Sequence, residues 1–268
     1  MIVLSYWLLG LFLGFCLADY RFLTVPDRKR LPKQWLLHFG IYVAGQVLTL
    51  LFPLTAIIAA SYSLAHGIGL LAWLGIGPIF GFLVWILADS FAEYISHVAA
   101  HRYPLLWAFH RVHHCDELVD ASTGIRHHPL DALWALCVQS VTAFVVAPAS
   151  ETILIWYFFL IAMQFYSHSR IDLPDRINSV LEKFFATPHI HRVHHSSYAA
   201  QTDSNYGGFF TIWDRLFGTF RNEIPEHLGL DDEALSGKNS RDFDTLILEP
   251  FNYLWRKWRN RKKPSVVG

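Results

Sequence analysis

Charged residues are scarce in this chain of 268 residues: they make up 16% of it, whereas apolar residues make up 53%. Soluble domains average about 25% charged residues. The shortage is local, because Asp89 is the only charged residue between Gln34 and Ser90. This pattern predicts membrane-spanning segments rather than a large soluble core. The 22 basic residues balance the 22 acidic ones, so no nucleic-acid partner is expected.

Cysteine is also rare, and the three residues Cys16, Cys115 and Cys137 are too scattered for a disulfide framework or an iron–sulfur cluster. Cys115 follows His114 and is expected to be a packed thiol, although metal ligation stays open for it. No G-x-G-x-x-G sequence precedes a helical segment, so a dinucleotide-binding motif is missing. Redox chemistry in this chain would therefore need electrons from a separate donor.

Long apolar runs predict an all-α integral membrane protein with about five transmembrane helices. The predicted spans cover residues 2–18, 35–65, 78–101, 131–147 and 151–167. The first is expected to be retained rather than cleaved as a signal peptide, since no positive charge precedes it. Pro53 falls inside the second, which is expected to tilt or kink. Turns are predicted at residues 66–77 and at Pro148.

Lysine and arginine are missing from two long stretches, residues 34–100 and 127–169. All 22 of them lie in residues 20–33, in residues 102–126 or beyond His168. The positive-inside rule places these three segments on the cytoplasmic side. The N-terminus is then outside, and the two turns, which carry no positive charge, face away from the cytoplasm.

Two domains are predicted from this division of the chain. Residues 1–168 form a transmembrane helical domain, and residues 169–268 form a small cytoplasmic cap of helices and loops. Residues 173–185 are expected to be a short helix, and the polar segment 196–218 is expected to cover the functional site. Residues 246–263 alternate apolar and basic groups, which fits a helix lying on the membrane and a solvated basic tail equally well.

Histidine, by contrast, is plentiful, with 15 residues in a regular pattern. Two of them, His97 and His101, are four apart and share one face of a helix. The spacing H-x2-H-H then occurs twice, at His110, His113 and His114 and again at His191, His194 and His195. Imidazole suits zinc, copper, iron and nickel, and eight imidazoles are too many for one tetrahedral ion. The spacing predicts two metal ions side by side.

The three histidine motifs, in this order, resemble the integral-membrane fatty acid hydroxylase and sterol desaturase superfamily. The segment from Asp89 to Tyr94 is similar to the segment that precedes the first histidine motif in that superfamily. Other sequence motifs similar to those of the superfamily are Leu106-Trp107-x-Phe109-His110, Arg126-x-His128-Pro129-x-Asp131, Asn205-Tyr206-Gly207 and Trp213-Asp214-x-Leu216-Phe217-Gly218-Thr219. The resemblance covers residues 89–220, roughly half of the chain. It implies a non-haem di-iron oxygenase with histidine ligands, O2 as co-substrate and a lipid substrate that enters from the bilayer.

Several further residues are candidates around the metal ions. His168 ends the fifth predicted span on one face with Gln164, and it resembles part of a superfamily Q-H-S-N phrase in which Arg170 replaces the asparagine. His168 is predicted to be a ligand, whereas His128 and Gln164 fit a ligand or an orienting group.

Three carboxylates, Asp89, Glu93 and Asp131, are predicted to orient the imidazoles that bind metal. Helix capping or pairing with an arginine stays open for them, above all for Asp131. His127 and His189 are expected outside the ligand set.

The sequence therefore favours an O2-dependent lipid hydroxylase, with a lipid desaturase as a close variant. Zinc has no redox chemistry, so it would fill the ligands without oxidising a C–H bond. A zinc-dependent membrane hydrolase would need only three protein ligands and a general base. A metal transporter would place ligands near the bilayer midplane, whereas these histidines gather at one predicted membrane surface.

Overall fold

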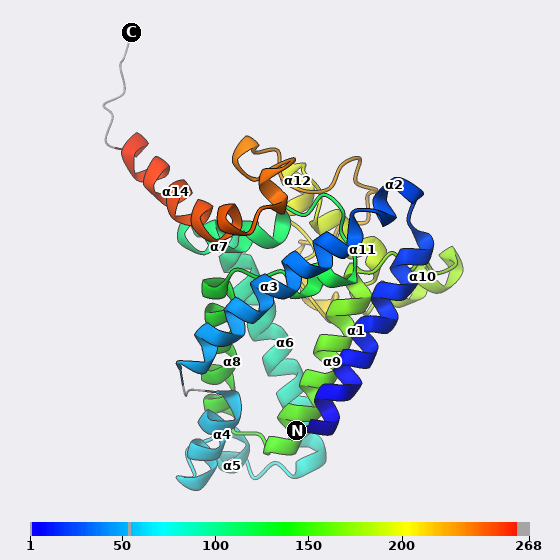
Figure 1. Cartoon of the computed structure of the whole chain (residues 1–268). Helices are drawn as coiled ribbons and strands as arrows, with labels where there is room; N and C mark the ends of the chain where they lie inside the picture. The colour runs from blue at the N-terminus through cyan, green and yellow to red at the C-terminus, as the bar shows by residue number, and fades with distance from the viewer. Residues whose placement is uncertain (1, 53–54, 262–268) are drawn as a thin grey trace.

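The computed structural model describes residues 2–52 and 55–261, which fold into helices joined by shorter connections (Figure 1). No β-strand forms within these ranges, where strand-like pairing is limited to two isolated bridges, Phe185 with Phe210 and Ser196 with Leu228. The all-α class predicted from the sequence is confirmed.

The longest helices of the described chain are α1 (Ile2–Phe22), α3 (Leu31–Leu50), α6 (Pro78–Arg102), α8 (Pro129–Val146), α9 (Ser150–His168) and α14 (Phe243–Arg261). The shorter α-helices are α2 (Val25–Arg28), α4 (Ala56–Ala65), α5 (Leu70–Trp73), α7 (Pro104–His114), α10 (Asp175–Leu181), α11 (Pro188–His194), α12 (Ala199–Thr202) and α13 (Ile212–Phe217). Three 3₁₀ turns complete them: η1 (Ala121–Ile125), η2 (Glu233–Leu235) and η3 (Asn239–Arg241).

Three stretches of the described residues are long and apolar enough to cross a membrane. They are Ala56–Trp73, Pro78–Arg102 and Pro129–Val146. The last two, α6 and α8, coincide with the predicted third and fourth spans. Helices α1 and α9 occupy the positions of the predicted first and fifth spans. The chain is a membrane protein with apolar helices, and the count of five spans stays a prediction.

The predicted second span, residues 35–65, is wrong as a single helix. Helix α3 ends at Leu50 and α4 begins at Ala56. Proline lacks the N–H that a helix interior needs, and Pro53 falls in this interval, outside the described residues. Thr55 then starts a new helix, because its side-chain oxygen accepts a hydrogen bond from the Ile58 backbone N–H at 3.3 Å. The predicted turn at 66–77 also contains a short helix, α5.

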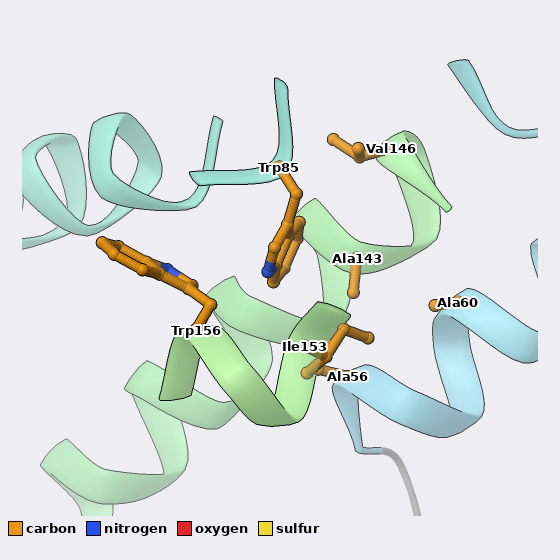
Figure 2. Packing of buried hydrophobic residues seen from close by; sticks show 7 residues of the cluster. All are labelled: Ala56, Ala60, Trp85, Ala143, Val146, Ile153 and Trp156. Carbon is orange, nitrogen blue, oxygen red and sulfur yellow. The ribbon is translucent and has the colours of Figure 1, made fainter. Parts of the chain in front are cut away.

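Helices α6, α8 and α9 run side by side, and the end of α6, the start of α8 and the end of α9 lie at the same end of the bundle (Figure 1). An apolar core joins them and α4 toward the opposite end, as Figure 2 shows. This core contains Trp85 of α6, Ala143 of α8 and Trp156 of α9. His97 follows Trp85 by twelve residues, so it lies about 18 Å further along α6. The core thus fixes three helices whose other ends carry polar groups.

The C-terminal part of the chain differs slightly from its prediction. Helix α10 ends at Leu181, earlier than the predicted 185, and α14 begins at Phe243 and is described to Arg261. Trp255 and Trp258 stack on each other on an exposed part of α14, with ring centroids 5.0 Å apart.

Candidate metal centre

Four helices bring histidines to the same end of the bundle. His97 and His101 lie one turn apart near the end of α6, and α7, which starts at Pro104, carries the first H-x2-H-H motif. His168 is the last residue of α9. The second H-x2-H-H motif occupies the end of α11, with His195 as the residue that caps it. The short α7 and α11 each present their histidines on one face, as the spacing predicted.

Nine histidines form two groups, within each of which one ring nitrogen per residue lies within 4.8 Å of the others. The five-histidine group consists of His97, His101, His110, His114 and His194. The four-histidine group consists of His113, His168, His191 and His195. All eight motif histidines and His168 are therefore brought together, and each group could hold a metal ion.

The Nε2 atoms converge within each group. In the five-histidine group, His97 Nε2 lies 3.0 Å from the Nε2 atoms of both His110 and His194. In the four-histidine group, His168 Nε2 lies 2.9 Å from His191 Nε2 and 3.2 Å from the Nε2 atoms of His113 and His195. An ion held about 2.1 Å from each nitrogen would bring neighbouring ligand nitrogens to within about 3.0–3.4 Å of each other. The observed spacing fits such an ion.

Protonation makes the case for a cation stronger in the five-histidine group. His97 Nδ1 lies 2.6 Å from the Tyr206 carbonyl oxygen, and His194 Nδ1 lies 2.7 Å from the Ser204 carbonyl oxygen. A carbonyl oxygen can only accept, so each Nδ1 carries the proton and donates it. The two Nε2 atoms are then bare, yet they lie 3.0 Å apart without a proton between them. A cation would remove the repulsion between these lone pairs.

Burial keeps the three imidazoles of the second H-x2-H-H motif neutral. Loss of solvation, followed by the neighbouring imidazoles, holds the pKa of His191 and of His195 well below the ordinary value for histidine. Burial lowers the pKa of His194 to about 3. Neutral imidazole is the form that binds a metal ion. The side chains are therefore ready to act as ligands at neutral pH.

A loop from the cap supplies the carbonyl acceptors. The Asp214 carboxylate accepts hydrogen bonds from the backbone N–H groups of Tyr206 and Gly207 at 2.8 and 2.9 Å, which fixes the loop that carries the Tyr206 carbonyl. The next N–H, that of Gly208, donates to Glu93 of α6 at 3.2 Å. A Cβ atom at Gly208 would lie 2.6 Å from Glu93 Oε1, so a larger residue there would require the Glu93 carboxylate to move.

The three predicted carboxylates have different partners. Asp131 accepts from His110 Nδ1 at 3.2 Å and from His127 Nδ1 at 2.8 Å. Asp89 instead accepts from the Trp156 indole N–H at 2.8 Å, and Glu93 accepts from the Gly208 backbone. Within the described part of the chain, neither Asp89 nor Glu93 has a hydrogen bond to a histidine of the two groups.

Asp203 is a carboxylate partner that the sequence did not single out. Its Oδ1 accepts from His101 Nδ1 at 3.2 Å. The sequence pointed to Asp203 only indirectly, because Asp203 and Ser204 come just before the Asn205-Tyr206-Gly207 motif. The carbonyl acceptors had no signal of their own, since every residue carries a backbone carbonyl.

His128 and Gln164 lie around the groups rather than in them. His128 caps α8, because its Nδ1 accepts from the Leu130 backbone N–H at 3.1 Å, while its Nε2 donates to the Ile247 carbonyl at 3.2 Å. Gln164 contributes its backbone carbonyl, which accepts from His168 Nδ1 at 2.7 Å. Both residues thus position helices or ligands by hydrogen bonds.

His127 and Cys115 also border the site. The His127 ring stacks on that of His113, with centroids 4.4 Å apart, and His127 forms a third close set with His110 and Asp131. The Cys115 thiol is buried and donates to the Val112 carbonyl at 3.3 Å. Cys115 belongs to neither histidine group, in keeping with a packed thiol.

Comparison with known proteins decides the family. A sequence model of fatty acid hydroxylases matches residues 82–219, which include both H-x2-H-H motifs and the Asn205-Tyr206-Gly207 loop. The chain belongs to the fatty acid hydroxylase family. The resemblance that the histidine spacing and its flanks carried is confirmed, and all nine histidines of the two groups lie inside the matched residues.

Individual relatives are lipid-modifying enzymes by name. The chain is 30% identical over 190 residues to the ornithine lipid hydroxylase OlsE of Rhizobium tropici, which covers 70% of this chain and 55% of that protein. It is 32% identical over 177 residues to the alkylglycerol monooxygenase of Caenorhabditis elegans, covering 64% of this chain and 33% of that protein. It is 26% identical over 134 residues to human lathosterol oxidase, covering 50% of this chain and 42% of that protein.

The matched region thus spans about half of the Rhizobium protein's length and about a third of the nematode protein's length. No solved structure matches this member of the family significantly.

Proposed function

We propose that this chain is an oxygen-dependent lipid hydroxylase that carries two iron ions, one in each histidine group. The observation that carries the proposal is the pair of adjacent all-histidine groups. His113 and His114 are consecutive on α7 but belong to different groups, and so do His194 and His195 at the end of α11. Two bound ions would therefore lie next to each other, because consecutive residues would bind different ions. A donor set made of imidazoles suits iron.

Bound iron would supply the redox chemistry with O2 that oxidation of an unactivated C–H bond requires. Overall, a C–H bond and O2 would be converted, with two electrons and two protons, to a hydroxyl group and water. The chain's own residues prepare this reaction by holding nitrogen ligands neutral and fixed. The carbonyls of Ser204 and Tyr206 hold the rings of His194 and His97, and Asp131 holds that of His110.

A membrane lipid is the proposed substrate. The apolar stretches that include α6 and α8 support this assignment, because helices of this length and composition would place the bundle among membrane lipids. The names of the relatives support it as well, since they are hydroxylases, monooxygenases or oxidases of lipids and sterols. Fatty acyl, sterol and related lipids all fit this class.

Electrons are proposed to come from a separate donor protein on the cytoplasmic side. Support for the side comes from the basic residues, which are all in residues 20–33, in residues 102–126 or after His168. Five spans, with residues 1–168 as the transmembrane domain and 169–268 as the cap, remain part of this proposal. The position of the Ser204 and Tyr206 carbonyls supports a cap that helps to build the site.

Lipid profiling of cells tests the function. Cells that express the wild-type chain are compared with cells that express His194→Ala, and with cells that express His189→Ala as a matched control. His189 lies on the same helix, but it pairs with Glu182 outside both groups. We expect a new hydroxylated lipid with the wild type and the control and none with His194→Ala. Identical lipid profiles for all three would refute the proposal.

A further inference from the structure

The two histidine groups differ in how the protein holds the second ring nitrogen, Nδ1, of each ligand. In the five-histidine group, four of the five Nδ1 atoms have a protein acceptor. The acceptors are Tyr206 O for His97 at 2.6 Å, Asp203 Oδ1 for His101 at 3.2 Å, Asp131 Oδ2 for His110 at 3.2 Å and Ser204 O for His194 at 2.7 Å. Only His114 lacks one among the described residues.

The four-histidine group shows the reverse. His168 Nδ1 donates to the Gln164 carbonyl at 2.7 Å. The Nδ1 atoms of His113, His191 and His195 are buried and have no hydrogen-bond partner among the described residues. The protein therefore orients one ring of this group by a strong Nδ1 hydrogen bond and leaves three to packing alone.

The charge of the Nδ1 acceptors also favours the five-histidine group. Two of the acceptors in the five-histidine group are carboxylates, Asp131 and Asp203, and a carboxylate on Nδ1 makes the opposite nitrogen a stronger ligand. The acceptor in the four-histidine group is a neutral carbonyl. A cation in the five-histidine group would thus have five nitrogen ligands and two nearby negative charges, whereas one in the four-histidine group would have four ligands and neither charge.

We propose that the two groups are unequal metal sites, in which the five-histidine group binds a divalent ion tightly and the four-histidine group releases its ion first. This inference rests on the proposed two-metal function, but its test requires no catalysis. Loss of one orienting partner typically costs 10- to 100-fold in metal affinity. We therefore expect the two affinities to differ by at least about tenfold.

Zinc release from the full-length purified protein tests the inference. The protein is loaded with zinc, which binds imidazole without redox chemistry, and a chelator is added stepwise while retained zinc is counted. We expect release in two steps of one equivalent each. His191→Ala should remove the first, loosely held equivalent and leave the second step in place.

Asp203→Asn identifies the tight step. Its side chain is 62% exposed, so the change is expected to leave the fold intact. We expect it to move the tight step about tenfold toward easier release, without moving the loose step. Asp131→Asn should have the same effect. Glu223→Gln is the matched control, because Glu223 pairs with Arg221 and Gln201 and has no hydrogen bond to an imidazole of the described residues.

Release of both equivalents in a single step would overturn the inference. So would binding of fewer than two equivalents, or a shift of the loose step alone in Asp203→Asn. If zinc leaves in two steps but no lipid is hydroxylated, the unequal sites hold and the proposed function fails. If lipid is hydroxylated but zinc leaves in one step, only this inference fails.

Discussion

His194 and His195 are consecutive residues whose Nε2 atoms face different histidine groups. His194 Nε2 lies 3.0 Å from His97 Nε2, and His195 Nε2 lies 3.2 Å from His168 Nε2. The His195 ring also stacks on that of His114, a member of the other group, with centroids 4.7 Å apart. One turn of α11 therefore contributes to both groups and sets their separation.

The first prediction concerns metal content. His194→Ala and His113→Ala each remove a ligand from a different group, so each variant should retain less metal than the wild type and lose activity. The apolar helices do not depend on these side chains, and both variants should still insert in the membrane. Elemental analysis of purified protein checks this, with His189→Ala as the control that keeps two equivalents. Two equivalents in both ligand variants would contradict the account.

The second prediction concerns Gly124 in η1. A Cβ atom there would lie 3.0 Å from the Gln164 carbonyl oxygen and 3.4 Å from His168 Nδ1, which are hydrogen-bonded to each other. Gly124→Ala should disturb that bond and weaken zinc binding by the four-histidine group about tenfold. Gly10→Ala is the control, because a Cβ atom at Gly10 would have no neighbour within 4 Å. An unchanged loose step of zinc release in Gly124→Ala would refute the proposed positioning role.

The third prediction concerns Glu93, which acts on the site through the cap loop. It accepts a hydrogen bond from Gly208, two residues beyond the Tyr206 carbonyl that holds His97. Glu93→Ala should loosen this loop and lower metal affinity about tenfold. Glu93→Gln keeps an acceptor oxygen, so it should restore most of the affinity. Metal titration of both variants checks this, and equal losses would show that the charge matters instead of the hydrogen bond.

The fourth prediction concerns topology. Single cysteines at Ser150 and at Asn178, in a background without Cys16, Cys115 and Cys137, should react with impermeant reagents from opposite faces of the membrane. Position 150 starts α9 in a stretch without basic residues, whereas position 178 follows the histidine end of that helix. Labelling of both positions from the same face would contradict the predicted arrangement.

Spacing along helices was the part of the site that sequence could predict. Ligands at i, i+3 and i+4 share a helix face whatever the tertiary structure, so the histidines of each H-x2-H-H motif are expected on the same side of their helix. His168 could also be predicted from the sequence, since it ends an apolar helix. The division of His113 and His114 between two groups could not be read from spacing, because it depends on how α9 and α11 pack against α7.

Hydrogen-bond partners were predicted less well. Asp89 and Glu93 share a helix stripe with His97, but side chains one turn apart on a membrane helix can turn to neighbouring segments, and here they bond Trp156 and Gly208. The division of residues 35–65 into α3 and α4 was also missed. Apolar composition alone does not distinguish one kinked helix from two helices.

Isotopically labelled O2 provides the most direct test of the central claim. The purified protein, loaded with iron and supplied with a reductant and membrane lipid, is exposed to labelled O2, and the lipid products are analysed by mass spectrometry. We expect one labelled oxygen atom in a hydroxyl group of the product, and no such product from His194→Ala. A new double bond without label would indicate a desaturase. Equal turnover of the lipid without oxygen would contradict the account.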